Sequence, residues 1–262
     1  MDRAERVATG LVAAERARRA QVAGAEVLEI DGLVLALANL PDPALSSVIV
    51  EREPGDARAA LEAAEAEFDR RGLQFGIDLQ VGRHPGVDRA VRAMSLTRII
   101  ERPGMVIDPR TLPDTPPPDG FDIRPVGGPD DAEALVQVGV AAFGDDPEVG
   151  RAFYGAGAVG LPQVRAFVAW RAGDDPVGIS AAYRDGPTTG VMGVGVHPSA
   201  RGHGLGSAIT VRAARAFPGC DLAWLHPSDE ARSMYARLGF ERVADWEVWA
   251  REAAEVDAAR IP

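Results

Sequence analysis

The residues best able to do chemistry lie between a hydrophobic run and an expected helix, in the stretch VHPSARGHGLG. Gly202, Gly204 and Gly206 occupy alternate positions there, directly after Arg201. Glycines allow backbone N–H groups to approach a ligand closely, and a helix start leaves such donors unpaired beside a partial positive charge. The segment therefore predicts an anion site. The guanidinium of Arg201 suits two phosphate oxygens, so a diphosphate is the expected ligand.

Two other phosphate-binding motifs fail on their residues. A Walker A loop requires a lysine, whereas all 28 basic residues of this chain are arginine. The dinucleotide fingerprint G-x-G-x-x-G fails in both frames, because its last glycine falls on Ser207 in one and on Pro198 in the other. The anion site is therefore of another kind.

The loop resembles the pyrophosphate loop of the GNAT superfamily of acyl-CoA-dependent N-acyltransferases, which has the pattern V-x-P-x-x-R-G-x-G-L-G. The matching residues are Val196, Pro198, Arg201, Gly202, Gly204, Leu205 and Gly206. A second block, SMYARLGF at Ser233 to Phe240, resembles the penultimate helix of that family and its Leu-Gly-Phe ending. The resemblance extends from about Phe121 to Trp249.

This resemblance implies an N-acetyltransferase that uses acetyl-CoA as co-substrate and no metal. The acetyl group would pass directly to a primary amine of a small molecule or amino-acid-like acceptor, within a ternary complex. The resemblance also implies that the backbone of Val194 to Val196 pairs with the pantetheine arm and that the loop, His203 included, holds the pyrophosphate. Tyr235 would protonate the departing thiolate.

The general base stays open. Many members of the family carry a glutamate on the strand before the loop, but this strand reads VMGVGV. His226 follows the strand-like run DLAWL and precedes Tyr235 by one short helix, so it is a catalytic candidate.

Three acids are candidates for binding the acceptor. Asp145, Asp146 and Glu148 follow the first expected helix of the second half, where related enzymes admit the amine. A cationic acceptor is slightly favoured by the net charge of -11. A solvated turn is the alternative interpretation of these acids.

Both halves of the chain show the same order of expected elements. After an opening helix, the first half has strand-like runs EVLEIDG, LVLALANL and SSVIV, a helix in DARAALEAAEAEFDRRG, strand FGIDLQV, helix DRAVRAMSL and strand GMVID. The second half has strand FDIRPV, helix DDAEALVQVGVAAF, strands RAFVAWRA, PVGISAAY and VMGVGV, a helix from about Gly204, strand DLAWL, helix DEARSMYARL and a closing ERVADWEVW. Because one order recurs, the halves are expected to be divergent repeats.

The repeat predicts an α/β (α+β) fold of two GNAT-like domains, each a mixed, mostly antiparallel sheet flanked by helices. A degenerate domain is expected at 1–112, a proline-rich linker at 113–120, the catalytic domain at 121–250 and a tail at 251–262. At the position of the phosphate loop the first half reads EREPGDARAA, whose acids repel an anion. DRAVRAM also contains no tyrosine, so the first copy is expected to be inactive.

Composition narrows the remaining classes. The chain is acidic, so a nucleic-acid partner is not expected, and it has no apolar stretch of about 20 residues that could span a membrane. The lone Cys220 and the absence of an export signal favour a cytoplasmic location, and no Cys/His/acid set has metal-ligand spacing. A homodimer, a non-catalytic acyl-CoA sensor or scaffold, and an acyltransferase for longer acyl chains all stay open.

Overall fold

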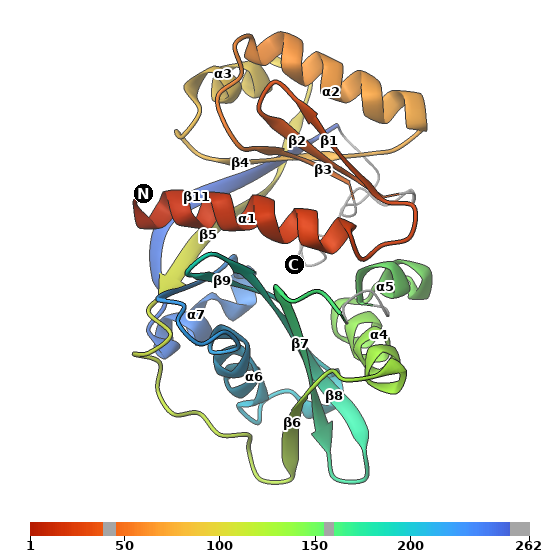
Figure 1. The fold of residues 1–262 in the computed structure, drawn as a ribbon, viewed down its shortest axis with the longest axis vertical. Helices are drawn as coiled ribbons and strands as arrows, with labels where there is room; N and C mark the ends of the chain where they lie inside the picture. Colours follow the sequence, from red (N-terminus) through yellow and green to blue (C-terminus); the bar gives the residue numbers. More distant parts are fainter. Residues whose placement is uncertain (39–45, 155–159, 252–262) are drawn as a thin grey trace.

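The computed structural model describes residues 1–38, 46–154 and 160–251. Within these residues, eleven strands form one continuous sheet in the order β1-β2-β3-β4-β11-β5-β10-β9-β8-β7-β6 (Figure 1). The strands are β1 (Glu26–Ile30), β2 (Leu33–Leu37), β3 (Ser47–Val50), β4 (Gly76–Gln80), β5 (Thr97–Ile107), β6 (Phe121–Pro125), β7 (Val164–Arg171), β8 (Asp175–Asp185), β9 (Thr188–Val196), β10 (Leu222–Leu225) and β11 (Glu241–Ala250).

Helices flank this sheet and supply the other half of the core. They are α1 (Arg3–Arg19), α2 (Ala57–Arg71), α3 (Pro85–Ala93), α4 (Pro129–Phe143), α5 (Pro147–Tyr154), α6 (Leu205–Ala214) and α7 (Asp229–Leu238), with a short 3-10 turn, η3 (Pro198–Ala200). The predicted fold class is confirmed: the sheet is mixed and mostly antiparallel, with parallel pairing at β3/β4 and β9/β10. Each parallel pair is joined through a helix, α2 or α6, as the predicted repeat requires.

Two elements differ from the sequence expectation. β5 begins at Thr97, well before the expected strand GMVID, because its first residues pair with β11, a strand from the far end of the chain. The helix α5 was not expected, since its residues read as an acidic turn. Asp146 caps the start of this helix, because its Oδ1 accepts a hydrogen bond from the N–H of Glu148 at 2.7 Å.

The last strands of the two halves are exchanged. β5, from the first half, pairs with β10, and β11, from the second half, pairs with β4. The buried carboxylate of Glu247 on β11 reinforces the exchange, because it accepts hydrogen bonds from Arg92 at 2.9 Å and Arg98 at 2.8 Å. The sheet therefore runs through both halves. The domain bounds 1–112 and 121–250, with a linker at 113–120 and a tail at 251–262, stay predictions. Most of the expected tail, 252–262, lies outside the described residues.

α1 lies across the junction between the two halves (Figure 1). Its apolar side chains pack in one cluster with Val34 of β2 and with Tyr183 and Met192 of β8 and β9. Gly10 allows this close approach, because a Cβ at that position would lie 2.5 Å from the indole nitrogen of Trp224. The opening helix therefore belongs to the core of both halves.

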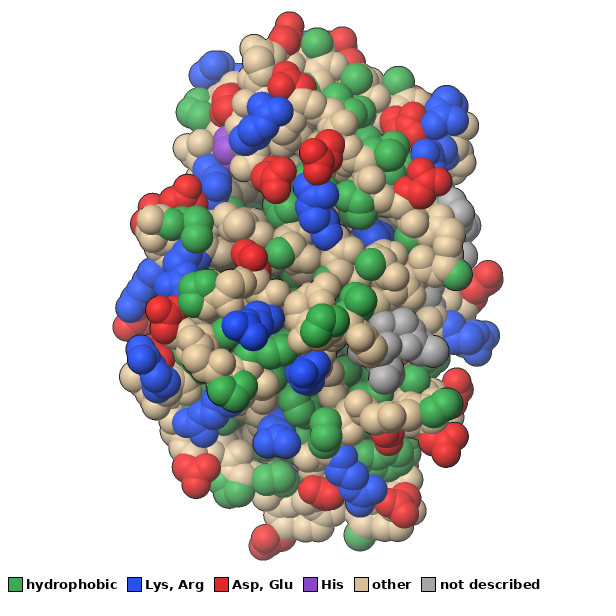
Figure 2. Space-filling view, in the orientation of Figure 1, with side chains coloured by type: hydrophobic (Ala, Val, Ile, Leu, Met, Phe, Trp, Pro, Cys, Tyr) green, Lys and Arg blue, Asp and Glu red, His purple; other side chains and the backbone are tan. Residues whose placement is uncertain are grey.

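Figure 2 shows acidic and basic side chains intermixed over the visible face. Among the helices that the structure describes, none combines the length and hydropathy of a membrane span. Across residues 1–38, 46–154 and 160–251, no group of three or more His, Cys, Asp and Glu side chains is arranged to hold a metal ion.

Candidate active site

β9 has two different edges. On one side it pairs with β8 along its length, and on the other it pairs with β10 only through residues 188–190. Residues 191–196 therefore present backbone that no strand of the described chain covers. Gly193, at φ 60°, lies where the register with β8 shifts, so the strand bulges within this stretch. An uncovered strand edge can pair with an extended, amide-bearing ligand, and the predicted Val194 and Val196 lie on it.

The loop that follows β9 holds open backbone donors. Gly202 and Gly204 have φ values of 83° and 80°, which glycine adopts without strain. A Cβ at either position would meet nothing within 4 Å, so the loop faces open space. Gly204 is the N-cap of α6 and offers no capping side chain, and the N–H groups of residues 202–206 find no acceptor within the described chain. These are the donors that an anion site needs.

Two loop side chains stabilise the loop itself. Arg201 donates from Nε to the carbonyl of Val196 at 3.1 Å and from Nη2 to the carbonyl of Ala142 at 3.0 Å. His203 places Nδ1 at 2.9 Å from the carbonyl of Arg201, and its ring lies 5.9 Å from that of Phe121. Arg201 thus ties the end of β9 to the last turn of α4 while keeping its charge at the loop. Phosphate binding by Arg201 and His203 stays a prediction.

The equivalent helix start in the first half is closed. The Oδ1 of Asp56 accepts from the N–H of Ala59 at 3.0 Å and so caps α2. Glu53 accepts from the N–H of Gly86 at 2.7 Å, which keeps a second carboxylate beside the loop. β3 also pairs with β4 as far as Ile49, so it has no long uncovered edge like that of β9. Both features of the second half are missing from the first.

Tyr235 lies beneath the point where β9 and β10 part. It is buried in a cluster with Val191 of β9 and Leu225 of β10. Its hydroxyl is hydrogen-bonded to Thr210, whose own hydroxyl donates to the carbonyl of Gly206 at 2.8 Å. Burial raises the pKa of Tyr235 to about 12, although the bond to Thr210 opposes the rise. The phenol is therefore protonated at neutral pH.

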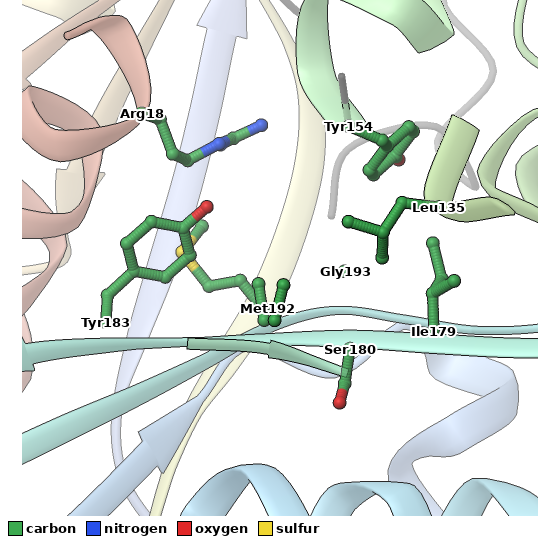
Figure 3. Close-up of a pocket in the computed structure, with 10 residues that line it drawn as sticks. Arg18, Leu135, Tyr154, Ile179, Ser180, Tyr183, Met192 and Gly193 are labelled. Carbon is green, nitrogen blue, oxygen red and sulfur yellow. The ribbon is translucent and has the colours of Figure 1, made fainter. Parts of the chain in front are cut away.

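A cavity opens on the other face of the sheet, over β8 and β9 (Figure 3). The space between its lining residues, together with the open solvent at its mouth, is about 430 Å³. Its lining comes from α1, α4, α5, β7, β8 and β9 and consists of Arg18, Leu135, Tyr154, Ala166, Ile179, Ser180, Ala181, Tyr183, Met192 and Gly193. The hydroxyl of Ser180 points away and donates to the carbonyl of Ile209 on α6 at 3.4 Å. The cavity and α6 thus lie on opposite faces, joined at the uncovered edge of β9.

Of the three predicted acceptor-binding acids, Asp145 is the one connected with this cavity. It accepts a hydrogen bond from the hydroxyl of Tyr154, a lining residue. Burial and the charge of Asp145 raise the pKa of Tyr154. Gly139 makes room for this tyrosine, since a Cβ there would lie 2.5 Å from its ring. Asp146 caps α5, and Glu148 is exposed on its first turn.

His226 does not line the cavity. Its ring centroid lies 4.6 Å from that of Trp246 and 5.5 Å from that of Trp224. Burial and the nearby charge of Arg102 hold the pKa of His226 well below its usual value. Its Nε2 is buried without a hydrogen-bond partner within the described chain. A catalytic role for His226 stays a prediction, and aromatic rings surround its neutral imidazole.

Sequence reasoning missed Arg18, Tyr154 and Tyr183. They come from α1, α5 and β8, so no single segment displays them together. One available signal was the run ERARR at the end of the opening helix, where charges occupy positions that the structure shows to be buried. Glu15 and Arg19 of that run are both buried.

The family model and the curated proteins that this chain matches are all acetyltransferases. Residues 162–242 match the family described as Acetyltransferase (GNAT) domain. A mycothiol acetyltransferase of Thermomonospora curvata is 31% identical over 241 residues, covering 82% of this chain and 77% of that protein. A second, from Gordonia bronchialis, is 29% identical over 234 residues, covering 78% and 72%.

Solved structures show the same fold. A GCN5-related N-acetyltransferase from Kribbella flavida superimposes with a TM-score of 0.76, at 23% identity, over 98% of both chains. A tandem GNAT protein from the clavulanic acid biosynthesis pathway has a TM-score of 0.59 at 21% identity, over 85% of this chain and 79% of that one. The two-copy arrangement therefore has a precedent in known structures.

Proposed function

Because the chain belongs to the GNAT superfamily and is an acetyltransferase, we propose that it moves the acetyl group of acetyl-CoA to the amine of a small acceptor held in the cavity of Figure 3. The observation that carries this proposal is the uncovered edge of β9. This edge runs from the cavity at Gly193 to the open donors at Gly202. It thereby connects an acceptor site with an anion site.

Each part of acetyl-CoA has a matching feature. The amides of the pantetheine arm suit the uncovered backbone of residues 191–196, which includes Val194 and Val196. The pyrophosphate suits the N–H groups of residues 202–206 and the charge of Arg201. A thioester at the inner end of the arm would then lie beside Gly193, at the floor of the cavity.

Acetyl transfer forms one bond, breaks another and moves two protons. The acceptor nitrogen bonds to the thioester carbon, the carbon–sulfur bond breaks, and the amine proton ends on the solvent or a base while the thiolate takes up another. Tyr235 supports the departing thiolate by offering a hydrogen bond, because its raised pKa keeps the phenol protonated. Asp145 and Tyr154 orient the amine. No carboxylate or imidazole that could act as a general base is found among the described residues that line the cavity. The acceptor amine would therefore enter the cavity in its neutral form or lose its proton to water.

The first half acts as a structural partner in this proposal. The carboxylates of Asp56 and Glu53 occupy the region where a diphosphate would bind, so one acetyl-CoA per chain is expected.

The test measures thiol release from acetyl-CoA against a panel of amines. The panel contains aliphatic amines, amino acids, amino sugars and the acceptor of the mycothiol acetyltransferases. Acceptor-dependent release with the acetylated amine detected by mass spectrometry is expected. Cys220 is buried, so the protein adds little background to a thiol assay. Tight acetyl-CoA binding without turnover across the panel would contradict transfer to a small amine.

A further inference from the structure

We infer that Tyr183 selects amine acceptors that carry an uncharged oxygen, because its phenol donates a hydrogen bond to that oxygen. The inference rests on the proposed function, since it concerns the acceptor that would occupy the cavity of Figure 3. The acceptor class is an amine with a hydroxyl, ether or carbonyl oxygen several bonds away from the nitrogen. Tyr183 would thus bind the end of the acceptor that does not react.

The hydroxyl of Tyr183 is buried and directed at the cavity. Tyr183 is 8% exposed, and its ring packs with Met192 in the cluster beneath α1. Figure 3 shows this ring on β8 with its hydroxyl directed into the cavity, across Met192 from Tyr154. Among the described residues this hydroxyl has no hydrogen-bond partner. A buried O–H group without a partner is unfavourable, so a ligand that supplies one is favoured.

The other hydroxyl groups of the described lining already have partners within the protein. Ser180 donates to the carbonyl of Ile209 at 3.4 Å, away from the cavity. The hydroxyl of Tyr154 is hydrogen-bonded to Asp145. Tyr183 is therefore the lining hydroxyl that a ligand can engage without breaking a bond inside the protein.

The surroundings of Tyr183 suit an uncharged partner that accepts a hydrogen bond. Burial raises the pKa of Tyr183, so the phenol keeps its proton at neutral pH and can donate it. The nearby guanidinium of Arg18 already faces a carboxylate, because its Nη1 lies 2.5 Å from Oε1 of Glu15. This end of the cavity therefore calls for no further charge, and a neutral oxygen is sufficient.

The strand register separates Tyr183 from the expected position of the thioester. Ser180 lies opposite the bulge at Gly193, where the register between β8 and β9 shifts. Tyr183 lies three residues further along β8, which corresponds to about 10 Å of strand. Met192 lines the interval and suits a methylene chain. An amine that attacks beside Gly193 would therefore need its oxygen several bonds away to meet the phenol.

The experiment uses pairs of amines that differ only in a terminal hydroxyl or methyl group: 4-aminobutanol with pentylamine, 5-aminopentanol with hexylamine, and 6-aminohexanol with heptylamine. With acetyl-CoA at saturation, kcat/KM is measured for each compound with the wild type and with Tyr183→Phe, which keeps the ring. The alcohol-to-alkylamine ratio is compared between the two proteins, so that the different hydration of the compounds cancels.

We expect Tyr183→Phe to lower this ratio by roughly twofold to tenfold in at least one pair, the range for a neutral hydrogen bond. A ratio that is the same in both proteins for every pair would overturn the inference. Thr189→Val is the matched control, because it removes a buried hydroxyl from the neighbouring β9 that does not line the cavity. Its ratios should equal those of the wild type, and an equal fall in both variants contradicts the assignment to Tyr183.

The wild type alone provides a second test, which applies even if Tyr183→Phe does not fold. Because one oxygen position meets the phenol, the alcohol-to-alkylamine ratio should pass through a maximum along a series of chain lengths from 2-aminoethanol to 8-aminooctanol. A ratio that changes steadily with chain length contradicts the inference.

A binding measurement separates this inference from the proposed function. The N-acetyl derivatives of each pair are titrated calorimetrically into the wild type and Tyr183→Phe with CoA present, which requires no turnover. Absence of turnover with every amine refutes the proposed function alone. Affinity ratios that are the same in both proteins refute the role of Tyr183 alone, whereas a ratio that falls in Tyr183→Phe supports it.

Discussion

Tyr235 and His226 show how the surroundings of a residue decide its chemistry. Both were chosen from the sequence as candidates for proton transfer, and both are in contact with aromatic rings. Tyr235 is connected through Thr210 to the carbonyl of Gly206, at the first turn of α6. The ring of His226 instead lies against that of Trp246, tilted by 47°. At the residue scale the tyrosine is therefore the better candidate.

Removal of the Tyr235 hydroxyl is expected to slow turnover. Tyr235→Phe keeps the ring contact with Phe240 but cannot offer a hydrogen bond to the thiolate. We expect kcat to fall by roughly a hundredfold, the lower range for general acid catalysis, with little change in acetyl-CoA affinity. Steady-state kinetics and calorimetry measure the two quantities. An unchanged kcat would remove Tyr235 from the mechanism.

Burial of His226 predicts an acid-sensitive stability. Its folded pKa is lowered from 6.5, so the unfolded chain binds the proton more readily. The contribution of the neutral His226 to the free energy of unfolding is complete above about pH 6.5 and is lost as the pH falls toward the folded pKa. The Tm of the wild type should therefore fall more steeply between about pH 7 and pH 5 than that of His226→Phe. Parallel curves from thermal scans would contradict this. The pKa of His84 is also lowered, and it titrates in both proteins.

At the scale of elements, α2 and α6 occupy equivalent positions in the two halves but differ at their N-termini. Asp56 caps α2 with a carboxylate, whereas Gly204 leaves α6 open. Both helices connect parallel strands. The difference in their first residues explains why one copy is proposed to bind acetyl-CoA and the other is not.

An acid placed at the start of α6 should reproduce the closed state of α2. In Gly204→Asp, a carboxylate would repel the pyrophosphate and compete for the open N–H groups. Gly204→Asn is the matched control, because both residues tolerate the φ of 80° and are nearly equal in size. We expect acetyl-CoA to bind roughly tenfold more weakly to the Asp variant than to the Asn variant in calorimetry. Equal affinities would show that the anion lies elsewhere.

At the scale of the whole molecule, the exchange of β5 and β11 makes the halves interdependent. β11 carries Glu247 into contact with Arg92 and Arg98 of the first half. α1 packs against strands of both halves. An isolated first half would lack the partner that covers β4, and an isolated second half would lack the strand beside β10.

The full chain is therefore expected to unfold in a single transition. Urea denaturation followed by tryptophan fluorescence and by circular dichroism should give coincident curves. Residues 1–112 and 113–262 expressed separately should be insoluble, and co-expression should recover acetyl transfer. Two resolved transitions, or a soluble and active second half, would show that the exchange is not essential.

The sequence alone determined the features that are local. The loop at Arg201 to Gly206, the helix that follows it and the order of strands in both halves depend on residue types at short spacing, and short spacing is what a sequence displays. It also indicated the closed start of α2, since Glu53 and Asp56 stand beside that helix in the chain.

Tertiary structure decided the features that join distant segments. The exchange of β5 and β11 depends on pairing between strands from opposite ends of the chain, which no local pattern encodes. The cavity gathers Arg18, Tyr154 and Tyr183 from three elements, and the burial of Arg18 beside Glu15 arises only when α1 packs across both halves. The proposed acetyl-CoA site could therefore be predicted from the sequence, whereas the proposed acceptor site became apparent only in the tertiary structure.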